Sequence, residues 1–139
     1  MPKKDKFHDT VTIALQKEQW DITNDPLFVP TQGGTNFFID LGAERFIGAE
    51  KDGEHIAVEI KSFGGNNPMY KFYEMLGQFL VYQLGLEEQQ KIWELFIAIS
   101  DVGYKKLDDS PIFKKAMQKY QLKFVIINAI SKTIIEWKR

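Results

Sequence analysis

Apolar side chains recur at two spacings along this chain of 139 residues, and the spacings predict a mixed order of helices and strands. Spacings of three and four residues predict helices over about 5–19 and 68–86, and Ser110-Pro111 is a typical start for a third helix. Runs that are apolar, or that alternate apolar with polar residues, predict strands. These strands are 27–29, 36–50, 54–63, 92–100, 122–130 and 133–137.

The order of these elements is helix, three strands, helix, strand, helix and two strands, with turn-forming residues at 20–26 between the first helix and the first strand. Strands interspersed with helices predict an α/β fold in which helices cover a mixed central sheet. We find no repeat and no Pro- or Ser-rich linker, so we expect a single domain over 1–139.

The composition excludes several classes of protein. The chain lacks cysteine, which excludes a disulfide framework, a thiolate nucleophile and a cysteine zinc site. Its longest apolar run, 95–99, is far shorter than the ~18 residues of a membrane span. The N-terminus is polar and lacks the apolar core of a signal peptide. We therefore expect a cytoplasmic protein with no membrane association.

Charge is distributed unevenly along the chain. Residues 1–110 carry 11 basic and 18 acidic side chains, whereas residues 111–139 carry seven basic side chains and one acidic side chain. Basic clusters of this kind can contact nucleic acid, and Lys114, Lys115 and Lys119 of the third predicted helix are the candidates. A solvated helix face is the alternative explanation, and the charge pattern alone favours it.

The segment with the clearest candidate chemistry is the predicted strand 54–63. Strand alternation places Glu59 and Lys61 on one face and apolar residues on the other. Charges inside a sheet that a helix covers are costly unless they are paired, solvated or bound to a metal. Two explanations of the pair remain open: a structural salt bridge, or a functional site in which both side chains take part.

A second carboxylate, Asp40, interrupts the otherwise apolar strand 36–50. Two converging carboxylates make an oxygen site suited to Mg²⁺ or Mn²⁺, and a nearby lysine can orient water or stabilise charge on a phosphate. Together, Asp40, Glu59 and Lys61 have the composition of a phosphodiester-cleaving site.

Strand register bears directly on this site. Asp52-Gly53 predicts a two-residue hairpin turn, which would set Phe46 opposite Glu59 and leave Asp40 about 20 Å away along the strand. Asp40 then reaches Glu59 only if the chain bends near 41–43. In that register Glu44 faces Lys61, so Glu44 is the alternative second carboxylate.

Asp40 followed by Glu59-Ile60-Lys61, with a helix on either side, resembles the PD-(D/E)xK nuclease superfamily. The runs IDLGAE (39–44), AVEIKSF (57–63) and LGQF (76–79) resemble the XisH family more closely, over nearly the whole chain. The resemblance implies a restriction-endonuclease-like fold, a metal site of Asp40 and Glu59 and a catalytic role for Lys61.

The same resemblance singles out residues on the helices. Gln78 would orient the site and Tyr82 lies one turn further along the same predicted helix, whereas Asp9 matches an acidic residue that superfamily members bring from the first helix. Solvent exposure of Asp9 and core packing of Tyr82 are the alternatives.

For function, the resemblance implies a factor that contributes to programmed excision of a DNA element, with DNA and an XisI-like protein as partners. Two hypotheses follow: a Mg²⁺-dependent endodeoxyribonuclease, or a regulatory module that keeps the nuclease fold and acts by binding its partner. A third hypothesis is an interaction domain without a catalytic site, in which Glu59 and Lys61 form a structural pair. We also expect that the protein can self-associate.

Overall fold

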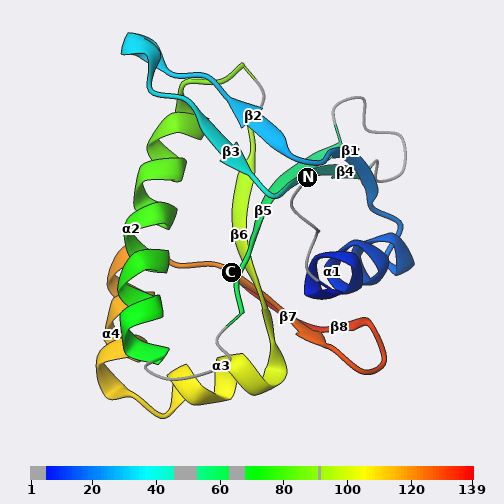
Figure 1. Ribbon diagram of the computed structural model, residues 1–139, viewed down its shortest axis with the longest axis vertical. Coiled ribbons are helices and arrows are strands. Elements are labelled where there is room, and N and C mark those ends of the chain that lie inside the picture. The colour runs from blue at the N-terminus through cyan, green and yellow to red at the C-terminus, as the bar shows by residue number, and fades with distance from the viewer. Residues whose placement is uncertain (1–5, 46–52, 63–67, 91) are drawn as a thin grey trace.

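A computed structural model describes residues 6–45, 53–62, 68–90 and 92–139, and Figure 1 shows a central sheet with helices on both faces. In chain order the elements are α1 (Lys6–Lys17), β1 (Asp21–Asn24), β2 (Leu27–Val29), the 3-10 turn η1 (Gln32–Gly34), β3 (Phe37–Ile39), β4 (Leu41–Arg45), β5 (Glu54–Ile60), α2 (Pro68–Glu87), β6 (Glu94–Ser100), α3 (Asp101–Asp108), α4 (Pro111–Tyr120), β7 (Phe124–Asn128) and β8 (Thr133–Lys138). No helix among these described residues is long and apolar enough to cross a bilayer.

Six strands form the main sheet in the order β1-β4-β5-β6-β7-β8. The central pairs β5–β6 and β6–β7 are parallel, whereas the outer pairs are antiparallel. The predicted mixed sheet flanked by helices is therefore confirmed.

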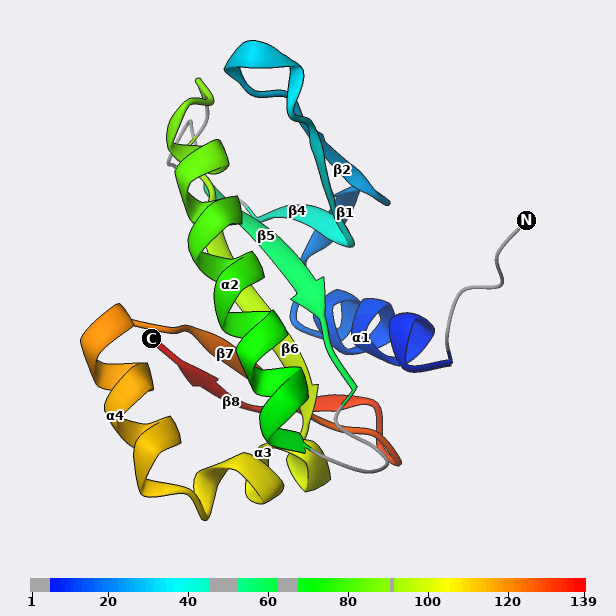
Figure 2. The same ribbon diagram turned by 60° about the vertical axis from the view of Figure 1, so that its left-hand side comes forward.

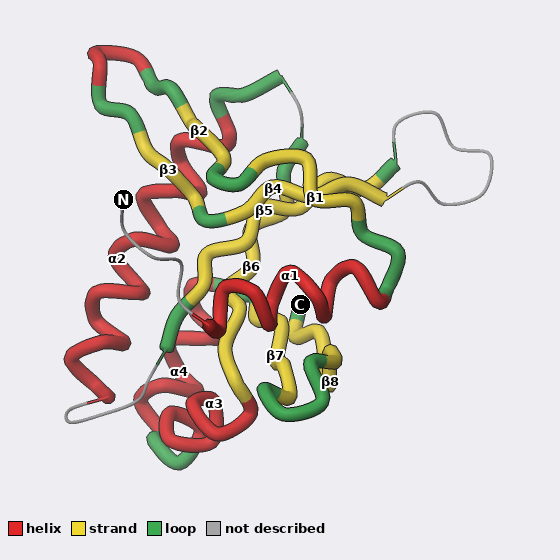
Figure 3. Tube along the Cα trace, turned by 45° about the vertical axis from the view of Figure 1, so that its right-hand side comes forward, coloured by secondary structure: helices red, strands yellow, loops and turns green. Residues whose placement is uncertain are grey.

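Each face of the sheet has its own core. On one face α1 packs on β4–β7 and buries Trp20 and Phe96, and Figure 3 shows α1 crossing in front of the strands. On the other face α2, α3 and α4 cover a second core, and Figure 2 shows α2 running across the strands on this face. Strand alternation divides β5 between these cores, because Ile56 and Val58 face α1 and Ala57 faces α2.

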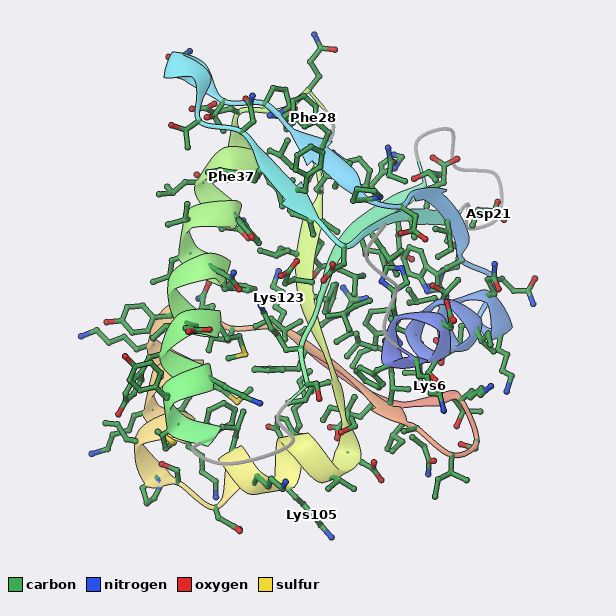
Figure 4. All side chains as sticks on the ribbon, viewed as in Figure 1. Lys6, Asp21, Phe28, Phe37, Lys105 and Lys123 are labelled. Atoms are coloured by element: carbon green, nitrogen blue, oxygen red, sulfur yellow. The ribbon has the colours of Figure 1, made fainter. Side chains whose placement is uncertain are left out.

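A two-stranded ribbon of β2 and β3 stands beside the C-terminal half of α2 (Figure 1). Phe37 of β3 projects from the ribbon toward this helix (Figure 4). A Cβ atom added at Gly85 of α2 would lie 2.8 Å from the Phe37 ring, so the contact depends on glycine at position 85. The side chain of Gln89 adds a hydrogen bond of 3.0 Å to the carbonyl of Pro30. The ribbon is thus held against α2 by packing and by hydrogen bonding.

Several sequence predictions need correction. Residues 36–50 do not form one strand, because the chain leaves the ribbon after Ile39 and enters the main sheet at Leu41. The short strand β1 lies within the predicted break at 20–26, and α3 was not predicted at all. The Ser100 hydroxyl caps α3 by accepting a hydrogen bond of 3.0 Å from the N–H of Gly103.

The predicted hairpin register is also wrong. A two-residue turn would pair residues whose numbers sum to 105, but Leu41 pairs with Val58 and Arg45 pairs with Glu54, so the numbers sum to 99. The chain between these strands is therefore longer than a two-residue turn. Of the predicted turn, Asp52 lies outside the described residues and Gly53 is the first described residue after that gap.

Candidate functional site

The end of β5 supplies two of the predicted site residues. Glu59 is on the α2 side of the strand and is only 9 % exposed. Lys61 lies just beyond the strand, where its N–H donates a hydrogen bond of 2.9 Å to the carbonyl of Ala98. Its ammonium group lies 3.3 Å from Oε2 of Glu59. The two charged side chains therefore share one face, as alternation predicted.

Asp40 joins them because of the observed register. Leu41 pairs with Val58, so the next residues outward, Asp40 and Glu59, lie across from one another. The carboxylate of Asp40 accepts a hydrogen bond of 2.8 Å from the N–H of Ile60, and the N–H of Asp40 donates one of 3.4 Å to Oε1 of Glu59. The bend expected near 41–43 does not occur, because these residues lie within β4, which pairs with β5 without a shift in register. The register alone sets Asp40 opposite Glu59, at the point where the chain passes from the ribbon to the main sheet.

Burial and charge make the Glu59 carboxylate an unusual acid. Burial, followed by the neighbouring charge of Asp40, raises its pKa from 4.5 to about 7, although Lys61 acts in the opposite direction. A group that binds a proton near neutral pH is also one that a cation can stabilise in its charged form. Such perturbed acids are typical of functional sites.

Helix α2 closes the site from above the sheet. Burial raises the pKa of Tyr82, and the charges of Glu59 and Asp40 raise it further, so its phenol lies within electrostatic reach of both carboxylates. Its ring packs on Phe37, with 5.4 Å between the ring centroids. One turn earlier, Oε1 of Gln78 is buried and has no hydrogen-bond partner among the described residues. An acceptor buried without a donor is costly, and a bound cation or water would satisfy it.

Phe37 and the N–H of Ile60 are site components that the sequence analysis missed. Phe37 packs against Tyr82, and the Ile60 N–H fixes the Asp40 carboxylate. The apolar residue at 37 is visible in the sequence, but its contact with α2 depends on the ribbon, which periodicity does not reveal.

Two of the acidic candidates lie elsewhere. Glu44 pairs with His55, and its Oε2 is 3.6 Å from Nδ1 of that histidine. Its predicted position opposite Lys61 is wrong, because the register differs and Glu44 lies four residues from Asp40, about 13 Å along the strand. Asp9 lines a surface hollow with Lys6 and Lys132 near the start of α1.

The candidate lysines lie on α4. Lys115 and Lys119 line a groove of about 420 Å³ whose other wall includes Leu76 of α2. Positions two residues apart on a helix point in nearly opposite directions, so Leu76 and Gln78 lie on opposite sides of α2. The helix therefore separates these lysines from the carboxylate site, and Lys114 lies on the same short helix.

The donor set suits a hard divalent cation. Asp40 and Glu59 supply only oxygen, which is the ligand type of Mg²⁺ and Mn²⁺, and Mg²⁺ commonly takes only one or two protein carboxylates and keeps several waters. No group of three or more acidic or histidine side chains suited to a metal occurs among the described residues. The residues therefore fit a cation that is held by two carboxylates and completed by water or a phosphate.

Comparisons with known proteins agree with this fold. The chain matches the family described as XisH protein over residues 1–135. A crystal structure of an XisH family protein from Nostoc punctiforme PCC 73102 is 34 % identical, with a TM-score of 0.84 over 97 % of this chain and 100 % of that one.

A second crystal structure, of an FdxN element excision controlling factor protein from Anabaena variabilis, is 31 % identical, with a TM-score of 0.85 over 98 % of this chain and 100 % of that one. Among curated proteins no sequence matches. The sequence match over nearly the whole chain and the shared architecture show that the chain belongs to the XisH family.

Proposed function

We propose that this chain is an excision controlling factor whose carboxylate site acts on DNA phosphodiester bonds with Mg²⁺ or Mn²⁺. Kinship with the Anabaena variabilis excision controlling factor supports the process. The observation that supports the chemistry is the convergence of Asp40, Glu59 and Lys61, with Glu59 Oε2 3.3 Å from the lysine ammonium.

In this proposal Asp40 and Glu59 hold the cation. When bound, a divalent cation polarises a phosphoryl oxygen and lowers the pKa of water. The hydrogen bond from the Ile60 N–H to Asp40 fixes one ligand in place. The hydrogen bond from the Asp40 N–H to Glu59 holds the second ligand beside the first.

Lys61 is the cationic group of the proposed site. It is 25 % exposed at its side chain, so it can reach an incoming phosphate while it stays close to Glu59. An ammonium group at this position stabilises negative charge that develops on the phosphate. Gln78 and Tyr82 line the α2 side, where the unpaired amide oxygen of Gln78 can accept a hydrogen bond from water.

A second candidate function is that of a non-catalytic module that binds an XisI-like partner. The acidic balance of residues 1–110 favours it, because phosphate binding depends on clustered lysine and arginine. The position of Lys115 and Lys119 on the far side of α2 also favours it, since these lysines do not extend the carboxylate site.

Cleavage assays separate the two functions. Purified protein, alone and with its partner, is incubated with single-stranded, duplex and branched DNA in Mg²⁺ or Mn²⁺, beside Lys61→Ala and Glu59→Gln. The nuclease hypothesis predicts cleavage that both substitutions reduce by at least ~100-fold. A titration of the protein with Mn²⁺, monitored by electron paramagnetic resonance, should show metal binding, and Glu59→Gln should weaken it.

The matched control uses an ion pair outside the site. Lys123 and Glu94 lie 3.0 Å apart at the sheet surface, so Lys123→Ala and Glu94→Gln remove the same chemical groups elsewhere. These variants should retain cleavage. Absence of cleavage under every condition, with unchanged partner binding in all variants, would instead support the regulatory module.

A further inference from the structure

The outer face of α2 carries an apolar stripe that the fold of one chain leaves exposed. Its large members are 37–64 % exposed and run the length of the helix; they are Tyr70, Tyr73, Leu80, Val81 and Leu84. Figure 2 shows this helix at the front of the molecule, with α4 beside part of it. Contiguous exposed apolar surface of this kind marks an interaction site.

The spacing of the stripe is that of a helix–helix contact. Positions 70, 73, 77, 80 and 84 alternate steps of three and four residues, which is the spacing of a coiled-coil seam. The middle position is Gly77, and a Cβ atom there would meet nothing within 4 Å. One chain therefore has no steric need for this glycine, in contrast to Gly85. A glycine inside a helix costs about 1 kcal/mol relative to alanine, and close approach of a second helix would explain it.

We propose that the stripe binds the same stripe of a second copy of this chain, antiparallel, about a two-fold axis near Gly77. Such an axis places the aromatic end of one helix, Tyr70 and Tyr73, on the aliphatic end of the other, Val81 and Leu84. Large rings then oppose smaller side chains at both ends, and the two backbones approach at the centre. An interface that repeats one patch on both subunits is the common form of a dimer.

On the α4 side of the stripe, the charges are complementary in this arrangement. Lys115 and Lys119 line the groove along the N-terminal half of α2, whereas Glu87 lines the groove along its C-terminal half, where Lys123 is already paired with Glu94. An antiparallel two-fold brings Lys115 of one copy toward Glu87 of the other.

The area is sufficient for a dimer. Helix α2 has 20 residues and is therefore about 30 Å long. With α4 packed beside it, the exposed face is about 20 Å wide, which gives about 600 Å² per copy, at the lower end of specific interfaces. We therefore expect a dimer that dissociates on dilution.

Sedimentation of the full chain at increasing concentration tests the proposal. The wild type should reach twice the mass of the 16.2 kDa chain. Gly77→Gln and Leu84→Glu should each raise the dimer dissociation constant at least tenfold without changing the circular dichroism spectrum. Ile130→Glu, at a residue that is 94 % exposed far from α2, is the control and should leave the constant unchanged. Glu87→Lys should weaken the dimer, and addition of Lys115→Glu should restore it.

Because the chain has no cysteine, single cysteines test the axis directly. Under mild oxidation Gly77→Cys should form a disulfide with its own copy, since a residue on the axis meets itself. Tyr70→Cys should cross-link when mixed with Leu84→Cys and not alone. A monomer at every concentration, including one that binds only a different partner protein, would overturn the proposal. So would a dimer that withstands both Gly77→Gln and Leu84→Glu.

Discussion

The two faces of the central sheet differ in what they bury. On the α1 face the described buried residues are apolar apart from Thr10, whose hydroxyl is bonded to the carbonyl of Lys6. On the α2 face the same strand, β5, presents the buried carboxylate of Glu59 beside Asp40. Adjacent positions of one strand thus lie in very different surroundings. The difference indicates that the α2 face gives up some stability at this point, as binding and catalytic sites commonly do.

A carboxylate placed on the α1 face gives the largest expected effect on stability. Val58 is fully buried and the side chains of its core cluster are apolar, so Val58→Glu places a carboxylate among apolar groups. We expect a loss of about 3–5 kcal/mol in the free energy of unfolding, measured by urea denaturation at pH 8.

The control for this substitution is Val58→Ala, which removes volume without adding charge and should cost about 2 kcal/mol. If Val58→Glu costs no more than Val58→Ala at pH 8, the two faces tolerate charge equally and the contrast is lost.

Removing the charge from the α2 face should have the opposite effect and increase the free energy of unfolding. The pKa of Glu59 is raised from 4.5 to about 7, so between these pH values the folded protein keeps a proton that the unfolded chain releases. Wild-type stability therefore falls as the pH rises through this window. Above pH 7 the free energy of unfolding of Glu59→Gln should exceed that of the wild type by about 3 kcal/mol, and the difference should vanish below pH 4.5. Urea denaturation across this range measures it.

Glu94→Gln is the matched control for Glu59→Gln, since it makes the same change with the opposite electrostatics. Burial raises the pKa of Glu94, but hydrogen bonds from Lys123 and Arg139 outweigh burial and hold that pKa below its usual value. Glu94→Gln should therefore destabilise the protein at neutral pH and have no effect in strong acid. If both variants shift stability in the same direction at pH 8, the proposed origin of the Glu59 shift is wrong.

The smallest of these effects concerns the two glycines of α2. A methyl group at Gly85 would press on Phe37 at 2.8 Å, so Gly85→Ala should cost about 1–3 kcal/mol and displace the ribbon that packs on Tyr82. Gly77→Ala meets open space and should stabilise the helix by up to about 1 kcal/mol. Thermal melting in dilute solution compares them, and equal melting temperatures would contradict the assigned contact.

Strand alternation alone predicted the arrangement of β5. It placed Glu59 and Lys61 together and separated them from Val58, because a period of two holds wherever a strand is buried on both sides. The register between β4 and β5 was not predictable in the same way. It depends on the length of the connection, and an Asp-Gly pair signals a turn without excluding a longer loop.

The missed elements are short. Strand β1 has the sequence DITN, whose aspartate and asparagine are common in turns, and its pairing with β4 decides its conformation. Helix α3 has eight residues and carries glycine in its first turn. Its N-cap at Ser100 and the basic residues of its last turn are legible in the sequence, and they are the signals that would have identified it.

Because of the hydrogen bonds between Asp40 and the end of β5, the site forms only when the strands pair correctly. Each carboxylate accepts a hydrogen bond from a backbone N–H of the other segment, so the acidic pair exists only when the two strands are aligned as observed. A slip by one residue would turn Asp40 toward the α1 face and abolish both bonds. A misassembled chain would therefore lack the acidic pair altogether, instead of presenting it in a distorted form.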